Sequence, residues 1–126
     1  MLAGRIRHES WRPHERLRKQ KDFERVYEAR EAYRTSNVVL FCYRQEDLDR
    51  KAAFVAGKKV GKAVERNRAR RLLRETFRRI KKSVLPSGVH LVFVARGGCA
   101  ERTYQEIRRE MVDLLDRAGL LIEPVD

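Results

Sequence analysis

Residues 64–82, VERNRARRLLRETFRRIKK, place apolar and cationic side chains at the spacing of an α-helix. At 100° per residue the apolar side chains fall within one arc, which predicts an amphipathic helix packed against a core. This arc holds Ala69, Leu72, Leu73, Thr76 and Ile80, with Phe77 at its border. The opposite side holds Asn67, Arg70, Arg71, Arg74, Arg78, Lys81 and Lys82.

The cations of this helix repel one another. Like charges four residues apart, such as Arg70 and Arg74, cost an isolated helix about 0.2–0.5 kcal/mol per pair. Only Glu65 and Glu75 interrupt the positive charge, whereas a surface that merely faces water usually mixes both signs. A bound polyanion would remove the repulsion, so the pattern favours nucleic-acid binding over a solvated charged helix.

The excess charge of the whole chain is concentrated around the same helix. From Gly57 to Lys82, twelve basic and two acidic residues give a net charge of +10. Residues 1–56 carry only +4, and residues 83–126 carry −2, which together make the total of +12. One face that binds a polyanion is therefore expected. The loop before the helix, GKKVGK at Gly57–Lys62, lacks the spacing of a Walker-type phosphate loop, so nucleotide hydrolysis is not indicated.

The flanking sequence predicts two further helices and three strands. The first helix spans Lys21–Arg30 with Asp22 as its cap, and the last spans Thr103–Ala118. A charged turn is predicted at Gln45–Arg50, between the first two strands. The strands, which are rich in β-branched and aromatic residues, are Asn37–Arg44, Ala52–Ala56 and Val89–Ala95.

The 126 residues suit one compact domain. We expect a flexible basic N-terminal arm over residues 1–13, a folded domain over residues 14–120 and a C-terminal tail over residues 121–126. No apolar run approaches the ~20 residues that span a bilayer, and the N-terminus lacks the apolar segment of a signal peptide. A cytoplasmic protein without membrane contact is therefore expected, with Cys42 and Cys99 as reduced, partly buried thiols.

No catalytic or metal-binding constellation emerges from the sequence. His8, His14 and His90 are scattered and have no metal-ligand spacing relative to the two cysteines. His90 is expected on the face of its strand opposite to Val89 and Leu91. We therefore expect no catalytic residue and no metal site in the protein, and no nuclease activity from the protein alone.

The segment Lys58–Arg74, KKVGKAVERNRARRLLR, resembles the signature of bacterial ribonuclease P proteins, with Arg66-Asn67-Arg68 at its centre. The resemblance extends over residues 14–120. It implies an α+β fold, a two-layer α/β sandwich with a mixed four-stranded sheet, which is shared with one domain of a ribosomal protein. It also implies a left-handed βαβ crossover through the arginine-rich helix. The fourth strand would be short and lie around Ala32–Thr35.

The resemblance further implies a role as the non-catalytic protein subunit of ribonuclease P. Such a subunit binds the catalytic RNA and precursor tRNA, takes no small-molecule substrate, and supports removal of the 5′ leader. The RNA carries the active site and most of the bound Mg²⁺. The RNA-binding residues would be Lys58, Lys59, Lys62, Arg66, Asn67, Arg68, Arg70, Arg71 and Arg74. The residue pattern alone favours a core role for three aromatic residues that the resemblance instead places in a leader-binding cleft: Phe23, Tyr27 and Phe41.

Three alternatives come from other functional classes. A small basic ribosomal protein, or another structural RNA-binding protein, would share the charge and the size. A DNA-binding regulator would need a dimer interface, and no long apolar surface stripe is evident for one. A self-sufficient nuclease would need convergent acids or histidines, which the sequence does not offer.

Overall fold

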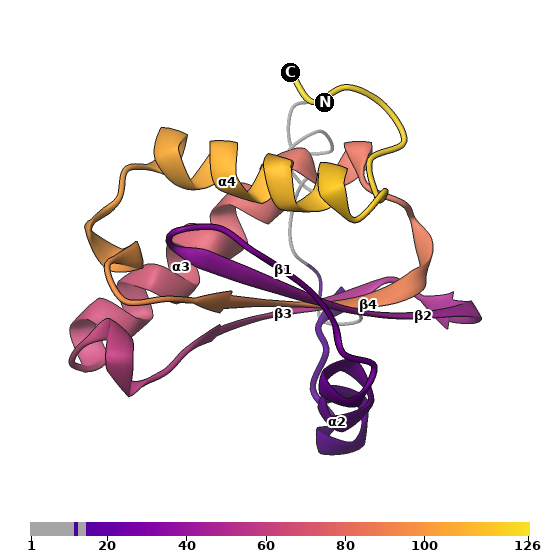
Figure 1. Cartoon of the computed structure of the whole chain (residues 1–126), viewed down its shortest axis with the longest axis horizontal. Helices are drawn as coiled ribbons and strands as arrows, with labels where there is room; N and C mark the ends of the chain where they lie inside the picture. The colour runs from indigo at the N-terminus through magenta and orange to yellow at the C-terminus, as the bar shows by residue number, and fades with distance from the viewer. Residues whose placement is uncertain (1–11, 13–14) are drawn as a thin grey trace.

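A computed structural model describes residue 12 and residues 15–126 (Figure 1). The N-terminal arm predicted over residues 1–13 lies outside these residues except for Arg12. Three short 3₁₀ segments, η2 (Lys58–Val60), η3 (Lys81–Ser83) and η4 (Cys99–Glu101), join the main elements. The main elements are α2 (Gln20–Glu28), β1 (Glu31–Arg34), β2 (Val38–Asp49), β3 (Lys51–Ala56), α3 (Ala63–Ile80), β4 (Ser87–Ala95) and α4 (Tyr104–Arg117).

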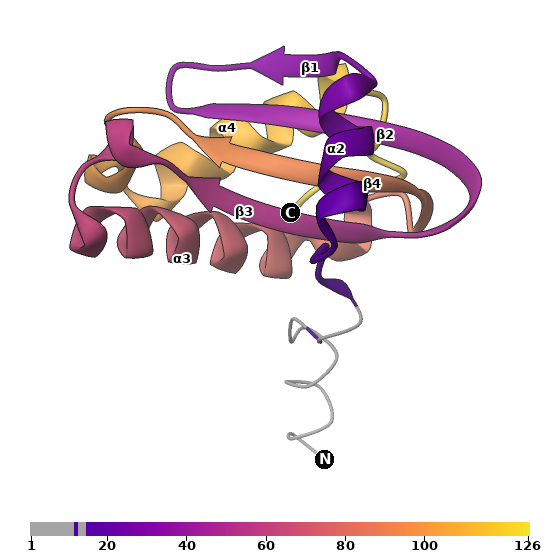
Figure 2. The same cartoon turned by 90° about the horizontal axis from the view of Figure 1, so that it is seen from below.

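The strands form one mixed sheet in the order β1-β2-β4-β3. β2 pairs antiparallel with both β1 and β4, whereas β3 pairs parallel with β4. α3 and α4 cover one face of this sheet, and α2 crosses the other (Figures 1 and 2). The α+β fold with a mixed four-stranded sheet is therefore confirmed. The short fourth strand lies at Glu31–Arg34, close to its predicted position.

The connection β3-α3-β4 is a left-handed crossover. β3 and β4 are parallel neighbours, and α3 lies on the face of the sheet away from α2 (Figure 2). Viewed from the α3 side with these strands pointing up, β4 lies to the left of β3. About 98% of such connections in proteins are right-handed. The handedness was an implication of the resemblance, and no residue pattern in the chain predicted it.

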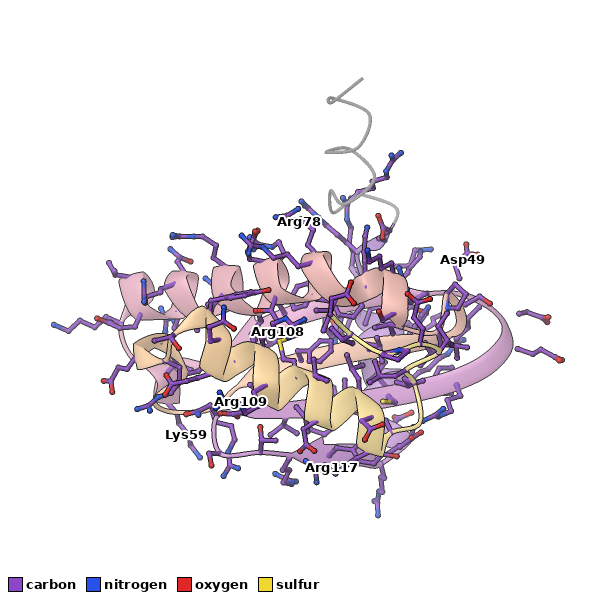
Figure 3. All side chains as sticks on the ribbon, turned by 90° about the horizontal axis from the view of Figure 1, so that it is seen from above. Asp49, Lys59, Arg78, Arg108, Arg109 and Arg117 are labelled. Carbon is purple, nitrogen blue, oxygen red and sulfur yellow. The ribbon has the colours of Figure 1, made fainter. Side chains whose placement is uncertain are left out.

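The main core lies between the sheet and the layer formed by α3 and α4, which Figure 3 shows from above. Alternation along β3 directs Ala52, Phe54 and Ala56 into this core and leaves the intervening residues on the α2 face. Phe54, Phe77 and Phe93 pack together with ring centroids 5.5–6.0 Å apart. The apolar arc of α3 is thus covered by strand side chains.

The predicted turn at Gln45–Arg50 is wrong, because β2 continues as an extended strand to Asp49. β4 lies between β2 and β3 in the sheet. The chain must therefore cross about two strand spacings, ~10 Å, before β3 begins. An extended segment reaches that far, whereas a tight turn would place β3 directly beside β2.

Some helix details also differ from the expectations. Asp22 lies within the first turn of α2, and the N-cap is Lys19, whose side chain makes no capping hydrogen bond. On α3, Leu72 is only half-buried, whereas Phe77 is fully buried. Lys81 was expected on the exposed cationic side, but α3 ends at Ile80 and Lys81 turns inward with η3.

Both cysteines are free and buried, and their burial raises the pKa of Cys42 to about 12 and that of Cys99 to about 11. They are therefore protonated thiols at neutral pH. His90 lies on the opposite face of β4 from Val89 and Leu91, which belong to the main core. Within residue 12 and residues 15–126, no helix is both long and apolar enough to cross a bilayer.

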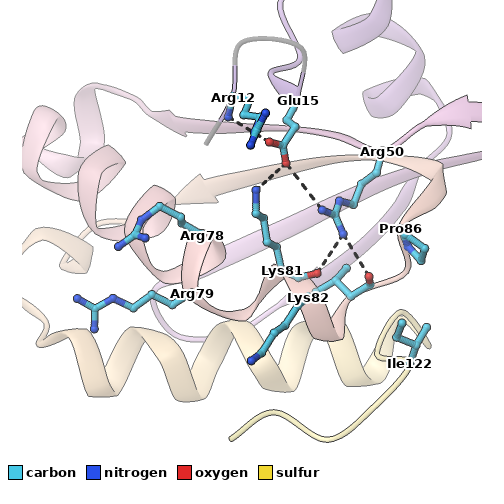
Figure 4. Close-up of a pocket in the computed structure, with 10 residues that line it drawn as sticks. Arg12, Glu15, Arg50, Arg78, Arg79, Lys81, Lys82, Pro86 and Ile122 are labelled. Atoms are coloured by element: carbon cyan, nitrogen blue, oxygen red, sulfur yellow. Dashed lines mark hydrogen bonds and ion pairs between the residues drawn. The ribbon is translucent and has the colours of Figure 1, made fainter. Parts of the chain in front are cut away.

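A buried ionic cluster joins the segment before α2 to the end of α3 (Figure 4). Lys81 Nζ donates to Glu15 Oε1 at 2.8 Å, and the Arg12 backbone N–H donates to the same carboxylate at 3.1 Å. Arg50 Nη2 lies 3.9 Å from Glu15 Oε1, and Arg50 Nη1 donates to the carbonyls of Lys81 and Val84. The cluster therefore satisfies backbone carbonyls that follow the last turn of α3.

We predict that the Glu15 carboxylate makes stability depend on acid pH. Burial alone would raise the pKa of Glu15, but hydrogen bonds from Lys81 and Arg12, with the charges of Lys81 and Arg50, lower it below the ordinary 4.5. A lowered folded pKa contributes stability above the ordinary value that is lost as pH falls. Glu15→Gln should be less stable than wild type at neutral pH, by roughly 1–3 kcal/mol. The difference should shrink as pH falls from about 5 to about 3.

Urea unfolding at a series of pH values measures this difference. Glu46→Gln is the matched control, because Glu46 is exposed on β2. A Glu15→Gln variant whose stability falls in parallel with that of the wild type over the whole acid range would contradict the assignment.

Candidate RNA interface

The cations of α3 divide into two groups on opposite flanks of the helix. Arg70 and Arg74 lie on the flank next to β3. Arg70 donates to the carbonyl of Ala56 at 3.4 Å and to the side chain of Asn67. Arg74 lines a hollow together with Arg16, which pairs with β3 just before α2. This flank therefore faces the side of the sheet that α2 crosses.

The other flank of α3 faces α4. Arg68 Nε donates to the carbonyl of Ala100 in η4 at 2.6 Å, so Arg68 points away from Arg70 and Arg74. Arg71 lines the same α3–α4 hollow as Arg68. The predicted RNA-binding arginines thus do not form one uniform stripe. They lie on two sides of α3, one next to β3 and the other next to α4.

The loop before α3 presents the predicted lysines at one end of the sheet. Lys58 and Lys59 line a hollow with Arg34 and Arg96, on a floor that includes Val94. Lys62, the N-cap residue of α3, is exposed.

Gly61 allows the tight entry into α3. Its φ of +140° suits glycine, and a Cβ there would lie 3.0 Å from the Cβ of Glu65. Glu65 in turn accepts a hydrogen bond from the Lys62 backbone N–H at 2.8 Å. The remaining predicted residues are close by on the first turns of α3: Arg66 is half-buried and Asn67 is exposed.

Arg74 lies among like charges within this surface. Burial lowers the pKa of Arg74, and the neighbouring charges of Arg16, Arg70 and Arg71 lower it further. Arg74 remains protonated, because an arginine pKa stays far above neutral pH. The unligated protein therefore holds like charges close together at the point where α3 meets the α2 side of the sheet.

The structure brings Phe23, Tyr27 and Phe41 together on the α2 face. The rings of Phe23 and Tyr27, one helical turn apart, have centroids 6.5 Å apart, and Tyr27 meets the edge of Phe41 at 5.0 Å. They lie over a small cluster that includes Leu17 and Val26. Tyr27 is 41% exposed, and Phe23 and Phe41 are half-buried. The three rings therefore form an open aromatic surface above a minor core.

The aromatic surface and the cationic flank of α3 are continuous. Phe23, Arg16 and Arg74 line one hollow, whose floor includes Ala53 and Val55 of β3. The sequence analysis missed Arg16, as well as Arg34 and Arg96 at the other end of the sheet. Their signals were weak, because all three lie outside the helical stripe of α3. Only strand pairing brings them beside α2 or the loop lysines.

Among the residues that the structure describes, no group of three or more His, Cys, Asp or Glu side chains could hold a metal ion. The geometry of this surface instead combines cations with open aromatic rings. Guanidinium groups bind phosphates, and aromatic rings stack on unpaired bases.

Comparison with known proteins identifies the family. A family model described as ribonuclease P matches residues 12–119. This chain belongs to the ribonuclease P protein family. The ribonuclease P protein component of Clostridium novyi (strain NT) is 39% identical over 109 residues, covering 84% of this chain and 95% of the relative. That of Clostridium botulinum (strain Langeland) is 36% identical over 106 residues, covering 83% and 95%.

Solved structures agree with the family and the fold. The ribonuclease P protein from Thermotoga maritima is 29% identical with a TM-score of 0.69, covering 82% of this chain and 96% of that one. The ribonuclease P protein of Staphylococcus aureus has the same fold at 24% identity, with a TM-score of 0.74 and coverage of 85% and 97%. The chain is thus the protein component of an endoribonuclease of tRNA processing. The alternative of a small ribosomal protein is not favoured.

We predict that Arg74→Met makes the free protein slightly more stable, because it removes a charge surrounded by Arg16, Arg70 and Arg71. The gain should be a few tenths of a kcal/mol, roughly one or two like-charge pairs. It should disappear in about 1 M salt, where the Debye length is ~3 Å.

Thermal unfolding at low and high salt measures the effect. Arg109→Met is the matched control on α4, since the Arg109 charge acts favourably on Glu106. A loss of stability in Arg74→Met that persists at both salt concentrations would show that repulsion is not significant there.

Proposed function

We propose that this chain binds the catalytic RNA of ribonuclease P through α3 and its preceding loop, and holds the 5′ leader of precursor tRNA on the aromatic surface beside α2. The observation that carries the proposal is the hollow in which Arg74 and Arg16 meet Phe23. There a phosphate-binding flank adjoins an aromatic ring. A single strand leaving an RNA bound on α3 would pass directly onto that surface.

The two parts of this surface suit different parts of RNA. The residues proposed to contact phosphates of the catalytic RNA are Lys58, Lys59, Lys62, Arg66, Asn67, Arg68, Arg70, Arg71 and Arg74. Phe23, Tyr27 and Phe41 would stack on leader bases. Stacking tolerates any sequence, because every base has a π-face. Leaders of different tRNAs differ in sequence, so this mode of binding suits a general processing enzyme.

The leader contact would also separate substrate from product. Precursor tRNA carries the leader, and mature tRNA does not, so only the precursor would occupy the aromatic surface. In this proposal the protein contributes no catalytic group. Mg²⁺, bound mainly by the RNA subunit, would activate water at the scissile phosphate.

We predict that the protein supports cleavage of precursor tRNA only together with a bacterial ribonuclease P RNA. At low Mg²⁺ the RNA alone should be slow, and adding the protein should restore cleavage at the mature 5′ end. The protein alone should give no cleavage. Gel assays of precursor tRNA with each component and with both would test this. Accurate cleavage by RNA-free, nuclease-free protein would refute the proposed division of labour.

A double variant decides whether α3 is the RNA-binding face. Arg70→Glu with Arg74→Glu should retain the circular dichroism of the wild type, since neither residue belongs to the main core. It should weaken binding to the catalytic RNA. The log–log slope of affinity against salt should fall by roughly 0.7–0.9 for each phosphate that the variant no longer neutralises. If this variant binds the catalytic RNA with wild-type affinity and wild-type salt dependence, the flank of α3 that carries Arg70 and Arg74 does not contact the RNA.

We predict that Tyr27→Ala and Phe41→Ala weaken binding of the holoenzyme to precursor tRNA but not to mature tRNA. Removing one stacked ring should cost about 1–3 kcal/mol of binding, or ~5- to 150-fold in affinity. Because Tyr27 is 41% exposed, its substitution should barely change the melting temperature. Phe77→Ala is the contrasting core variant and should lose ~3–5 kcal/mol of stability. Equal loss of affinity for both tRNAs would contradict leader binding.

A further inference from the structure

The hollow between α3 and α4 is lined by residues of α3 together with Arg102 and Tyr104. These two helices lie on the face of the sheet opposite to α2 (Figures 1 and 3). The volume of the hollow is about 380 Å³, within the ~300–1,000 Å³ of sites that hold small ligands. Four arginines and one carboxylate line it, with two half-buried apolar or aromatic side chains. These residues are Arg68, Arg71, Arg79, Arg102, Glu75, Leu72 and Tyr104.

The carboxylate of this groove is already neutralised. Glu75 lies within ion-pair distance of Arg78 and Arg79, and these contacts lower its pKa, so it remains ionised. The groove therefore keeps a net positive charge through Arg68, Arg71 and Arg102. In the described part of the chain, no hydrogen bond or ion pair engages Arg71.

Arg79 is held as a flat platform at the edge of the groove. Its Cζ lies 4.8 Å from the ring centroid of Tyr104, and its Nε donates to Glu75 Oε2 at 3.0 Å. The side chain is nevertheless 51% exposed. The guanidinium thus lies over the tyrosine ring and is fixed at a second point by the carboxylate. RNA-binding proteins stack unpaired bases on guanidinium planes of this kind.

The phosphate-binding groups of the groove are also anchored. Arg68, which lines the groove, is tied through Nε to the carbonyl of Ala100 at 2.6 Å. Arg102 Nη1 lies 3.9 Å from Glu106 Oε2, and Arg102 Nε donates to the carbonyl of Gly98 at 3.4 Å. Anchored side chains lose less conformational entropy when they bind.

We propose that the α3–α4 groove binds an unpaired nucleotide of the catalytic RNA. Its base stacks on Arg79, and its flanking phosphates are held by Arg68, Arg71 and Arg102. The inference rests on the proposed function and extends it, because it gives the helix layer a second contact with the catalytic RNA. Leader binding uses the opposite face of the sheet, so the two sites can be filled at once.

Two variants test base stacking separately from charge, because they alter the Arg79–Tyr104 platform and keep the net charge of the groove. Arg79→Lys retains the cation but loses the guanidinium plane, and Tyr104→Leu removes the ring that supports it. Both should weaken binding to the catalytic RNA by roughly 5- to 100-fold with an unchanged salt slope. Arg102→Gln should weaken binding and also reduce the slope by about 0.7.

Arg109→Lys is the matched control for Arg79→Lys. Arg109 is exposed on α4, and Figure 3 labels it on the side away from α3. The Arg109→Lys variant should therefore bind the catalytic RNA as the wild type does. Melting temperatures identify any variant that fails to fold. If Tyr104→Leu fails to fold, the comparison of Arg79→Lys with Arg109→Lys still decides. Wild-type affinity in Arg79→Lys and Tyr104→Leu would overturn the proposal, whether the groove is then empty or holds only duplex phosphates.

Two further measurements separate this inference from the proposed function. The groove variants should keep the wild-type preference for precursor over mature tRNA, since the leader surface is intact. If the wild type fails to bind the catalytic RNA at all, the proposed function is wrong. Single-stranded oligouridylate containing 4-thiouridine then tests the groove itself. Crosslinks to the α3 and α4 peptides that contain Arg79 and Tyr104 support the groove, and their absence overturns it.

Discussion

The burial of one side of α3 allows its other sides to carry cations that repel one another. Leu73, Phe77 and Ile80 are buried against the sheet, and each is worth about 1.5–3 kcal/mol of hydrophobic stabilisation. Each like-charge pair at helical spacing costs only about 0.2–0.5 kcal/mol. Packing therefore exceeds repulsion by several-fold, and the helix can hold a dense array of arginines without a bound counter-charge. That array is the feature from which RNA binding follows.

The sheet separates the helix layer formed by α3 and α4 from the aromatic surface beside α2. α3 and α4 cover one face, and α2 covers only part of the other (Figure 2). A short helix on an open sheet face leaves Phe23, Tyr27 and Phe41 half-buried, because the minor core beneath them is too small to cover them. Since α3 lies beside β3 at the edge of the sheet, its cations reach both faces. The left-handed crossover places this helix on the face of the sheet opposite to α2.

Two carboxylates, Glu15 and Glu110, connect loop segments to the helices through ion pairs and hydrogen bonds. Glu15 and Lys81 pair across the chain and connect the segment before α2 to the end of α3. Glu110 of α4 plays a similar part at the other end. It accepts hydrogen bonds from the Thr35 hydroxyl and from the backbone and side chain of Asn37, between β1 and β2. Both acids fix loops that flank the proposed RNA-binding surfaces.

The sequence by itself determined the elements with a clear period. The helix over residues 64–82, the three apolar strands and the last helix follow from patterns of 3.6 and 2 residues, which depend only on local geometry. The charge on α3 and the RNA-binding class were also evident, because twelve basic residues lie within one short segment. The resemblance added the fourth strand and the crossover.

Only the tertiary structure decided how these parts meet. It divided the arginines of α3 between two flanks, since the rotation of a helix against its sheet is set by packing. It extended β2 through a charged segment, because β4 must fit between β2 and β3. It buried Lys81 beside Glu15, which lies 66 residues earlier in the chain. It also set Arg79 over Tyr104. Each of these depends on contacts between distant segments, and no local period encodes such contacts.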